Sequence, residues 1–208
     1  MKRIEELTNY IYPHKIIADI GCDHGYLIKF AFDKGLIDKA YAIDNKEKPL
    51  NNAKKNLKGY ENIDYFLSDG LDYLPTDCSL IVLAGMGGNL ITNILKKGLA
   101  IHPHIERIII EANRNQEMVR KFAVENGLKI VSEAIIEEDN IFYEIIVLEK
   151  GYITYNDKEL MFGPILLKEK SPIFINKWTK KLQTYLNKNT KTLEKEIKLI
   201  KEVINYED

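Results

Sequence analysis

The sequence predicts an α/β protein, with a doubly wound, Rossmann-like sheet of seven strands followed by a small helical hairpin. Three observations support this fold. Short apolar runs alternate with longer amphipathic runs through the first 150 residues, which indicates a parallel sheet covered by helices on both faces. Two strand-like runs then follow each other directly, and two amphipathic stripes at helical spacing occur near the end of the chain.

The parallel part of the sheet is expected to alternate with helices. Helices are predicted where apolar residues recur at helical spacing, over residues 26–37, 48–60, 89–99 and 116–128. Gly127 is placed to cap the last of these helices. The expected strands are residues 15–21, 39–44, 63–70, 79–88 and 107–113.

The end of the sheet breaks this alternation. Residues 129–139 and 141–151 are both strand-like, and only Asn140 separates them. No crossover helix fits in that gap, so the two strands must pair as an antiparallel hairpin at the edge of the sheet. A seven-stranded, mostly parallel sheet with one reversed strand is typical of the class I methyltransferase version of this fold. We therefore assign residues 1–151 to a ligand-binding domain of that type.

The chain changes character after Gly151. Residues 152–172 contain a Gly-Pro pair and are expected to form a linker with some local structure. Two helices are predicted beyond it, over 174–186 and 193–204, with residues 187–190 between them. We expect an antiparallel hairpin of coiled-coil type within the second unit, 152–208, and one continuous helix is the alternative. The two stripes are Ile175, Trp178, Leu182 and Tyr185, and Leu193, Ile197, Ile200 and Ile204.

Charge and composition narrow the class of protein. The net charge is −1, but residues 168–201 carry 10 Lys+Arg against 3 Asp+Glu. This basic tail indicates an anionic partner, and a solvated helix face is the alternative. No apolar run approaches the roughly 18–20 residues that span a membrane. The only cysteines, Cys22 and Cys78, suggest reduced thiols in a cytoplasmic protein. The four histidines lack metal-ligand spacing, so we expect no metal site.

The loop "ADIGCDHG", residues 18–25, is the first candidate ligand site. A dinucleotide-binding fingerprint would need glycine at Asp23, so that motif is absent. We expect Gly21 to turn the chain off the strand, Gly25 to let the next helix pack closely, and Asp19 to fix the loop by accepting N–H bonds. This loop can receive a carboxylate. S-adenosylmethionine carries a carboxylate, an amine and a nucleoside, and it fits; an incidental strand–turn–helix is the alternative.

Two aspartates end the second and third strands. Asp44 can accept hydrogen bonds from both ribose hydroxyls of a nucleoside, and Asp69 can accept one from the adenine amino group. The alternatives are an ordinary loop aspartate at the first position and an Asp-Gly turn at the second. Because parallel strands end at one edge, where doubly wound sheets bind ligands, we interpret both aspartates together with the opening loop.

The stretch "LAGMGGN", residues 83–89, follows the fourth strand. In methyltransferases this position faces the acceptor atom. Its three glycines are expected to leave space for a flat substrate beside the methyl group, and Met86 is expected to line that space. A tight loop that leads into the next helix is the alternative. The pattern Asp/Asn-Pro-Pro-Tyr, typical of exocyclic amino-group methylation, is absent.

Three segments carry a resemblance to a known family. "ADIGCDHGYL", "AGMGG" and "GPILLKEK" (163–170), followed by the helical segment, resemble the bacterial tRNA (adenine-22-N1)-methyltransferases over essentially the whole chain. The resemblance implies methylation of N1 of an adenosine in the D-arm of tRNA by S-adenosylmethionine. It also implies cofactor contacts from Gly21, Asp44, Asp69, Gly70 and Gly85. The alternatives are another RNA or small-molecule methyltransferase and a non-catalytic RNA-binding protein.

These patterns give a defined set of candidate residues. Adenine N1 has its own lone pair, so no catalytic base is required. His24, Met86 and Gly87 are candidates for positioning the substrate, and His24 and Asp23 alternatively only build the turn. We expect a monomer that binds tRNA. The predicted cofactor-binding residues are Asp19, Gly21, Asp23, His24, Gly25, Asp44, Asn45, Asp69, Gly70, Ala84, Gly85 and Met86.

The residues that would hold the target base are less sharply defined. A base that has left its helix is usually stacked on an aromatic ring. Arg3 and Arg114 can reach either a phosphate or the cofactor carboxylate. The aromatic candidates are Tyr26, Phe142, Tyr143 and Phe162, and burial in the core is the alternative for each.

Overall fold

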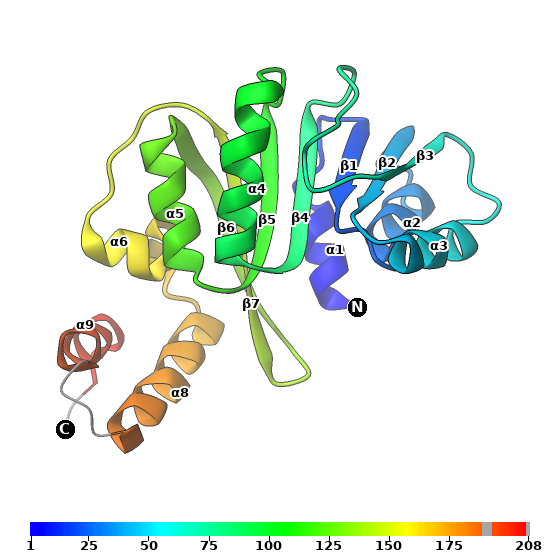
Figure 1. Cartoon of the computed structure of the whole chain (residues 1–208). Helices are drawn as coiled ribbons and strands as arrows, with labels where there is room; N and C mark the ends of the chain where they lie inside the picture. Colours follow the sequence, from blue (N-terminus) through cyan, green and yellow to red (C-terminus); the bar gives the residue numbers. More distant parts are fainter. Residues whose placement is uncertain (189–192, 207–208) are drawn as a thin grey trace.

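The computed structural model describes residues 1–188 and 193–206 and has a seven-stranded sheet at its centre (Figure 1). The strand order is β3-β2-β1-β4-β5-β7-β6. β7 runs antiparallel to both of its neighbours, and the other neighbouring strands pair in parallel. The predicted sheet, with its hairpin at the edge, is therefore confirmed. The strands are β1 (Ile16–Ile20), β2 (Lys39–Asp44), β3 (Ile63–Leu67), β4 (Leu80–Gly87), β5 (Arg107–Arg114), β6 (Leu128–Glu138) and β7 (Ile141–Lys150).

Helices cover both faces of the sheet. α1 (Lys2–Thr8), α2 (Tyr26–Asp33) and α3 (Glu47–Asn56) pack on one face, and α4 (Gly88–Ile101) and α5 (Gln116–Glu125) lie on the other, in front of the sheet in Figure 1. Strand side chains alternate between the two cores, so Ile17 joins the first and Ala18 the second. Both faces are covered, which is why the central strands read as continuous apolar runs.

Several predicted boundaries differ from the structure. The helix predicted over 26–37 ends at Asp33, close to Gly35, which has φ +64°. The strand predicted over 63–70 ends at Leu67. α1 was not predicted, because its seven residues offer only Ile4 and Leu7 as a buried apolar pair. Two residues are too few for helical periodicity to stand out.

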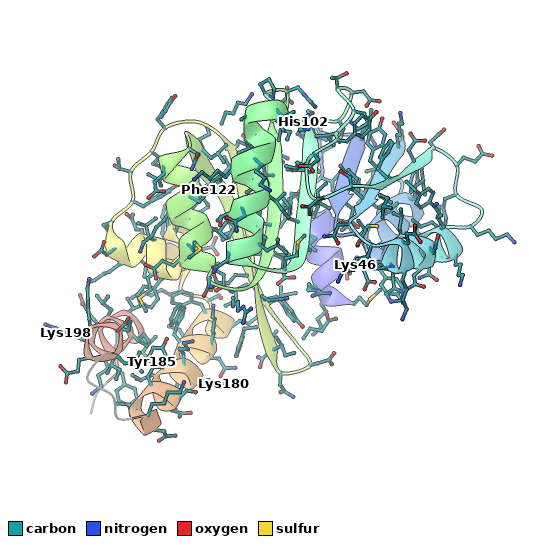
Figure 2. All side chains as sticks on the ribbon, in the orientation of Figure 1. Lys46, His102, Phe122, Lys180, Tyr185 and Lys198 are labelled. Atoms are coloured by element: carbon teal, nitrogen blue, oxygen red, sulfur yellow. The ribbon has the colours of Figure 1, made fainter. Side chains whose placement is uncertain are left out.

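The two edges of the sheet at which its strands end differ in what surrounds them. The parallel strands end at the lower edge in Figure 1, where α1 and the turn between β6 and β7 also lie. The end of α4, marked by His102, is at the opposite edge (Figure 2). The imidazole of His102 bonds the Leu71 carbonyl oxygen at 2.8 Å, so it fastens the far edge of the molecule.

The C-terminal segment packs around a third, small core, which also includes Ile135 of β6. The predicted linker contains α6 (Asp157–Phe162) and α7 (Pro164–Glu169), and α8 (Pro172–Lys188) and α9 (Glu194–Ile204) follow. A capping box of Asn156 and Glu159 starts α6. Trp178 and Leu182 of α8 cluster with Ile200 and Val203 of α9. α8 and α9 thus pack together as a hairpin requires, whereas one continuous helix would keep them apart. The coiled-coil geometry stays a prediction, and residues 189–192 lie outside the described residues.

A buried ion network joins this segment to the sheet. The Arg120 guanidinium of α5 is fully buried and donates to Glu133 (2.7 Å) and Glu144 (2.6 Å) of the hairpin. Glu144 also pairs with Lys177 of α8. Burial alone would raise the pKa of Glu144, but the charges of Lys177 and Arg120 hold it below its usual value. A Cβ added at Gly163 would lie 2.6 Å from a Glu133 oxygen, which explains the glycine before Pro164.

Within residues 1–188 and 193–206, no helix combines the length and the apolar character needed to cross a membrane.

Candidate functional site

The loop after β1 is fixed by its backbone. The amides of Gly21 and Cys22 both donate to the Ile43 carbonyl oxygen, at 2.8 and 3.1 Å. Gly21 has φ +77°, and a Cβ there would lie 3.0 Å from the Met86 methyl carbon. At Gly25, φ is +69° and a Cβ would lie 2.7 Å from Leu57, so the helix that this glycine allows to pack closely is α3 and not the next helix along the chain, α2. At both positions glycine is required for two reasons, the positive φ of the backbone and the lack of space for a Cβ atom.

The prediction that Asp19 fixes this loop is wrong. Its carboxylate is 5% exposed and accepts no hydrogen bond from any described residue. The Asp23 amide instead donates to Asp44, at 3.4 Å, because the turn carries that amide toward the end of β2. Burial, followed by the charges of Asp44 and Asp23, raises the pKa of Asp19 to about 7. A buried carboxylate without a donor is what an incoming cation would satisfy.

Asp44 is placed to bind hydroxyl groups. One of its oxygens accepts the Asp23 amide and the other accepts the Lys46 amide at 3.0 Å. A carboxylate has about four acceptor positions, so each oxygen keeps one for a ligand. Lys46 lies at the sheet's strand-end edge in Figure 2. The carboxylate is therefore held rigidly, with two acceptor positions still unused.

Asp69 stands next to Asp44, beyond the end of β3. Its side chain is exposed, and its oxygen lies 3.4 Å from the amide nitrogen of Asn45. Gly70 has φ +58°, and a Cβ there would lie 2.9 Å from Ile94 of α4. The turn at residues 68–70 therefore presses on α4 and leaves the Asp69 carboxylate facing the same edge as Asp44.

The glycines after β4 have different tasks. β4 pairs with β5 as far as Gly87, with irregular register around Met86, so the predicted open loop is largely bulged strand. Gly85 has φ +75°, and a Cβ added there would meet no atom within 4 Å, so it does leave open space. Gly88 does not, because a Cβ there would lie 2.5 Å from the Asn115 carbonyl oxygen. A Cβ at Gly87 would lie 3.3 Å from the Arg114 Nε, so the expectation of space at all three glycines holds for Gly85 alone.

Polar residues of β5, which the sequence reasoning missed, hold this bulge. The fully buried Glu111 accepts the Gly85 amide at 3.0 Å, and Asn113 donates to the Gly85 carbonyl oxygen at 2.7 Å. Arg3 of α1 pairs with Glu111 at 3.3 Å and lies 5.0 Å from the Tyr143 ring centre. The signal was available in "EAN", residues 111–113, because these polar residues end a buried strand at the same edge.

The aromatic candidates separate by burial. Phe162 is fully buried among Phe174 and Trp178, so its core alternative holds. Phe142 and Tyr143 are half-buried, and Tyr26 is exposed. The rings of His24 and Tyr26 stack with centres 5.4 Å apart at 15°. His24 and Tyr26 therefore present a flat surface at the mouth of the loop.

Two adjoining cavities run along this edge. The Asp44 cavity, about 240 Å³, is lined by Asp44, Asn45, Asp69 and Gly70 and by the apolar side chains of Pro49, Leu90 and Ile94. The Asp19 cavity, about 340 Å³, is lined by Arg3, Asp19, His24, Tyr26, Ala84, Gly85 and Asn113. Gly21, Asp23 and Met86 line both cavities. Almost every predicted cofactor residue therefore borders one elongated site.

The hydrogen-bond acceptors of this site suit one kind of ligand. A buried acceptor for a cation lies at one end, and acceptors for hydroxyls and an amino group lie at the other. S-adenosylmethionine carries its ammonium and its adenosine at opposite ends, so the residues present fit it. No group of three or more His, Cys, Asp or Glu side chains within the described part of the chain is placed to hold a metal ion.

Comparisons with known proteins agree on one family. The family model described as tRNA (adenine(22)-N(1))-methyltransferase matches residues 17–207. The Bacillus subtilis protein of that description is 31% identical, over 99% of this chain and 97% of its own. The structure of Streptococcus pneumoniae Sp1610 in complex with S-adenosyl-L-methionine is 36% identical, with TM-score 0.93 over 98% of this chain and 99% of that one. Mycoplasma capricolum TrmK in complex with S-adenosyl-homocysteine is 27% identical, with TM-score 0.80 over 99% and 94%.

Proposed function

This chain belongs to the tRNA (adenine(22)-N(1))-methyltransferase family, and from that premise we propose which of its residues bind the methyl donor and the tRNA. The enzyme transfers a methyl group from S-adenosylmethionine to N1 of adenosine 22 of tRNA. The observation that carries the residue assignment is the pair of adjoining cavities, with a carboxylate at each end and Met86 between them.

The Asp19 cavity receives the methionine end of the cofactor. The buried Asp19 carboxylate, which lacks a donor among the described residues, accepts the cofactor ammonium. The turn at residues 21–25 and the side chain of Arg3 face the cofactor carboxylate. Arg3 has a further role, since its pair with Glu111 supports the bulge at Gly85.

The Asp44 cavity receives the adenosine end. The two unused acceptor positions of Asp44 match the two ribose hydroxyls. Asp69 accepts from the adenine amino group, and Asn45 holds the Asp69 side chain. Pro49, Leu90 and Ile94 provide apolar surface for the adenine ring. In this arrangement the sulfonium methyl group of the cofactor lies near Met86, which lines both cavities.

The target adenine enters at the bulge of β4. S-adenosylmethionine supplies a methyl group that the N1 lone pair of adenine attacks directly. Gly85 leaves room for the ring, and Asn113, fixed to the Gly85 carbonyl oxygen, borders the same space. His24 and Tyr26 offer a stacked surface at the mouth. The residues contribute positioning, which can supply about 7–11 kcal/mol in favourable cases.

The pKa of Asp19 gives a test of the cofactor assignment. Between its usual value of 3.8 and about 7, folded Asp19 holds a proton that the unfolded chain has lost. Its contribution to folding stability therefore falls as pH rises through that window. Cofactor binding needs the ionised form, so we expect affinity for S-adenosylmethionine to rise from pH 5.5 to 7, by as much as about tenfold per pH unit, with proton release.

Calorimetry at several pH values, in two buffers of different ionisation enthalpy, measures both quantities. Asp19→Asn is expected to bind more weakly, to lose the pH dependence below 7, and to be more stable than the wild type at pH 7 without cofactor. Asp38→Ala, an exposed aspartate before β2, is the matched control and should keep the wild-type profile. An unchanged pH slope in Asp19→Asn would remove Asp19 from the ammonium site.

The C-terminal segment helps to hold the tRNA. Residues 1–151 form the cofactor-binding domain, and residues 152–208 form the second unit. The basic residues of 168–201 support electrostatic contact with the phosphate backbone. The ion network of Arg120, Glu133 and Glu144 fixes α8 against the sheet, so the basic helix keeps a defined position beside the site.

The working form is a metal-independent monomer in the cytoplasm. Direct attack by adenine N1 gives a metal ion no necessary part in the reaction. tRNA as substrate supports the cytoplasmic location. Cys22 and Cys78 are buried free thiols, and burial raises the pKa of the Cys22 thiol well above its usual value. The thiol therefore stays protonated and unreactive beside the cofactor loop.

A further inference from the structure

Arg114 differs from the other arginines of the chain. The sequence has four, and Arg3, Arg107 and Arg120 each pair with glutamate. Arg114 is exposed, and its guanidinium has no hydrogen-bond or ion-pair partner among residues 1–188 and 193–206. A guanidinium presents a planar fork of donors that matches the oxygens of a phosphate. An unpaired arginine is therefore available to an anionic ligand.

Arg114 lies directly beside the methyl-transfer edge. It is the last residue of β5, and a Cβ added at Gly87 would lie 3.3 Å from its Nε. The preceding residue, Asn113, lines the Asp19 cavity and also a further cleft. The two hollows thus share Asn113 as a lining residue, and Arg114, the next residue along β5, lines the further cleft.

This further hollow, which we term the basic cleft, has a volume of about 500 Å³. It lies between the end of β5, the turn that joins β6 to β7, and α8. Lys180, which is labelled in Figure 2, is one of the residues of α8 that line it. None of its lining residues within the described chain is acidic. Four are basic, four carry amide side chains, and Phe142 adds an aromatic ring. The basic residues are Arg114, Lys177, Lys180 and Lys181.

The charges of the cleft are not all equivalent. Lys177 and Lys180 pair with Glu144 and Glu137, so much of their charge is compensated. Lys181 has no ion pair among the described residues, and its ammonium lies 4.9 Å from the Tyr185 ring centre. The uncompensated positive charge is therefore that of Arg114 and Lys181, on opposite walls of the cleft.

We propose that the basic cleft binds the RNA backbone next to the target adenosine, with Arg114 on a phosphate flanking the flipped nucleotide. This rests on the proposed function. Flipping turns a nucleotide about its own backbone, so the flanking phosphates must stay close to the mouth of the pocket. Phosphate contacts need cations, and unpaired bases use aromatic rings and amide groups. The cleft supplies all three beside Gly87.

The first test compares two substitutions that remove the same charge. Arg114→Gln should weaken binding of unmodified tRNA about ten- to hundredfold. It should also reduce the salt slope of log K by roughly 0.7–0.9, the value for one phosphate contact. Lys55→Gln, on the exposed face of α3 at the far end of the sheet, is the control and should change neither. Cofactor affinity, measured by calorimetry, should be unchanged in both variants.

A second test locates the phosphate. A neutral methylphosphonate is placed, one position at a time, at the phosphates within two nucleotides of adenosine 22. At one position the wild type should lose binding to the same extent as Arg114→Gln, and the variant should lose nothing more there. Additive losses at every position, or an Arg114→Gln salt slope equal to that of Lys55→Gln, would overturn the proposal. Wild-type methylation of adenosine 22 in the same assays would leave the proposed function standing.

Discussion

Replacing Arg120 by Met is expected to lower the free energy of unfolding by about 3–5 kcal/mol, because the change leaves two buried carboxylates without their shared cation. The guanidinium also donates to the Leu160 and Met161 carbonyl oxygens at 3.3 Å, so α6 loses its anchor as well. For a chain of this length, the melting temperature should fall by roughly 6–20 °C. Denaturant titration and thermal unfolding measure the effect.

Neighbouring positions provide the controls. Lys121→Met removes one positive charge from the exposed side of the same helix and should change stability by no more than about 0.5 kcal/mol. Adding Glu133→Gln to Arg120→Met should recover part of the loss, since one unpaired charge is then gone. If Arg120→Met were as stable as Lys121→Met, the network would not be what holds the C-terminal segment on the sheet.

Replacing Asp44 by Ala is expected to weaken S-adenosylmethionine binding by roughly 1–3 kcal/mol, or about 5- to 150-fold, through loss of charge-assisted hydrogen bonds to the ribose. The side chain also accepts the amides of Asp23 and Lys46, so the loop after β1 loses a support at the same time. Calorimetry with the cofactor measures the first effect, and thermal unfolding without cofactor measures the second.

The control for Asp44 lies at the other end of the same strand. Asp38 precedes β2, is exposed, and its side chain forms no hydrogen bond or ion pair with the described residues. Asp38→Ala should bind the cofactor like the wild type. Equal affinity of Asp44→Ala and the wild type, with both folded, would contradict the assignment of the adenosine end to the Asp44 cavity.

The fold could be predicted from the sequence because its signals are local. Buried parallel strands are uninterrupted apolar runs, and the single residue between 129–139 and 141–151 excludes a crossover. Asp44 and Asp69 could be found because Asp44 ends β2 and Asp69 closely follows β3, and the topology brings strand ends to one edge. α1 could not be predicted, because only two of its seven residues, Ile4 and Leu7, are apolar and buried, and two positions do not define a helical period.

The details of the site depended on contacts between distant residues. The stretch "EAN" marks Glu111 and Asn113 as polar residues at a strand end, but their roles follow from bonds to Gly85, 26 and 28 residues away, which the stretch itself does not encode. Asp44, and not Asp19, accepts the amide of the loop because a turn at positive φ carries the Asp23 amide toward β2. Asp23 stands where a dinucleotide-binding loop has glycine. Its backbone has φ +43°, a left-handed conformation that glycine adopts most readily.

Methyl transfer to N1 of adenosine 22 is tested by comparing two tRNA transcripts. Unmodified tRNA transcript is incubated with the enzyme and labelled S-adenosylmethionine, beside a transcript that carries 1-deazaadenosine at position 22 and is otherwise identical. Direct attack by adenine N1 predicts labelling of the first transcript and none of the second, because the deaza base lacks the attacking nitrogen. Equal labelling of the two transcripts would contradict methyl transfer to N1 of adenosine 22.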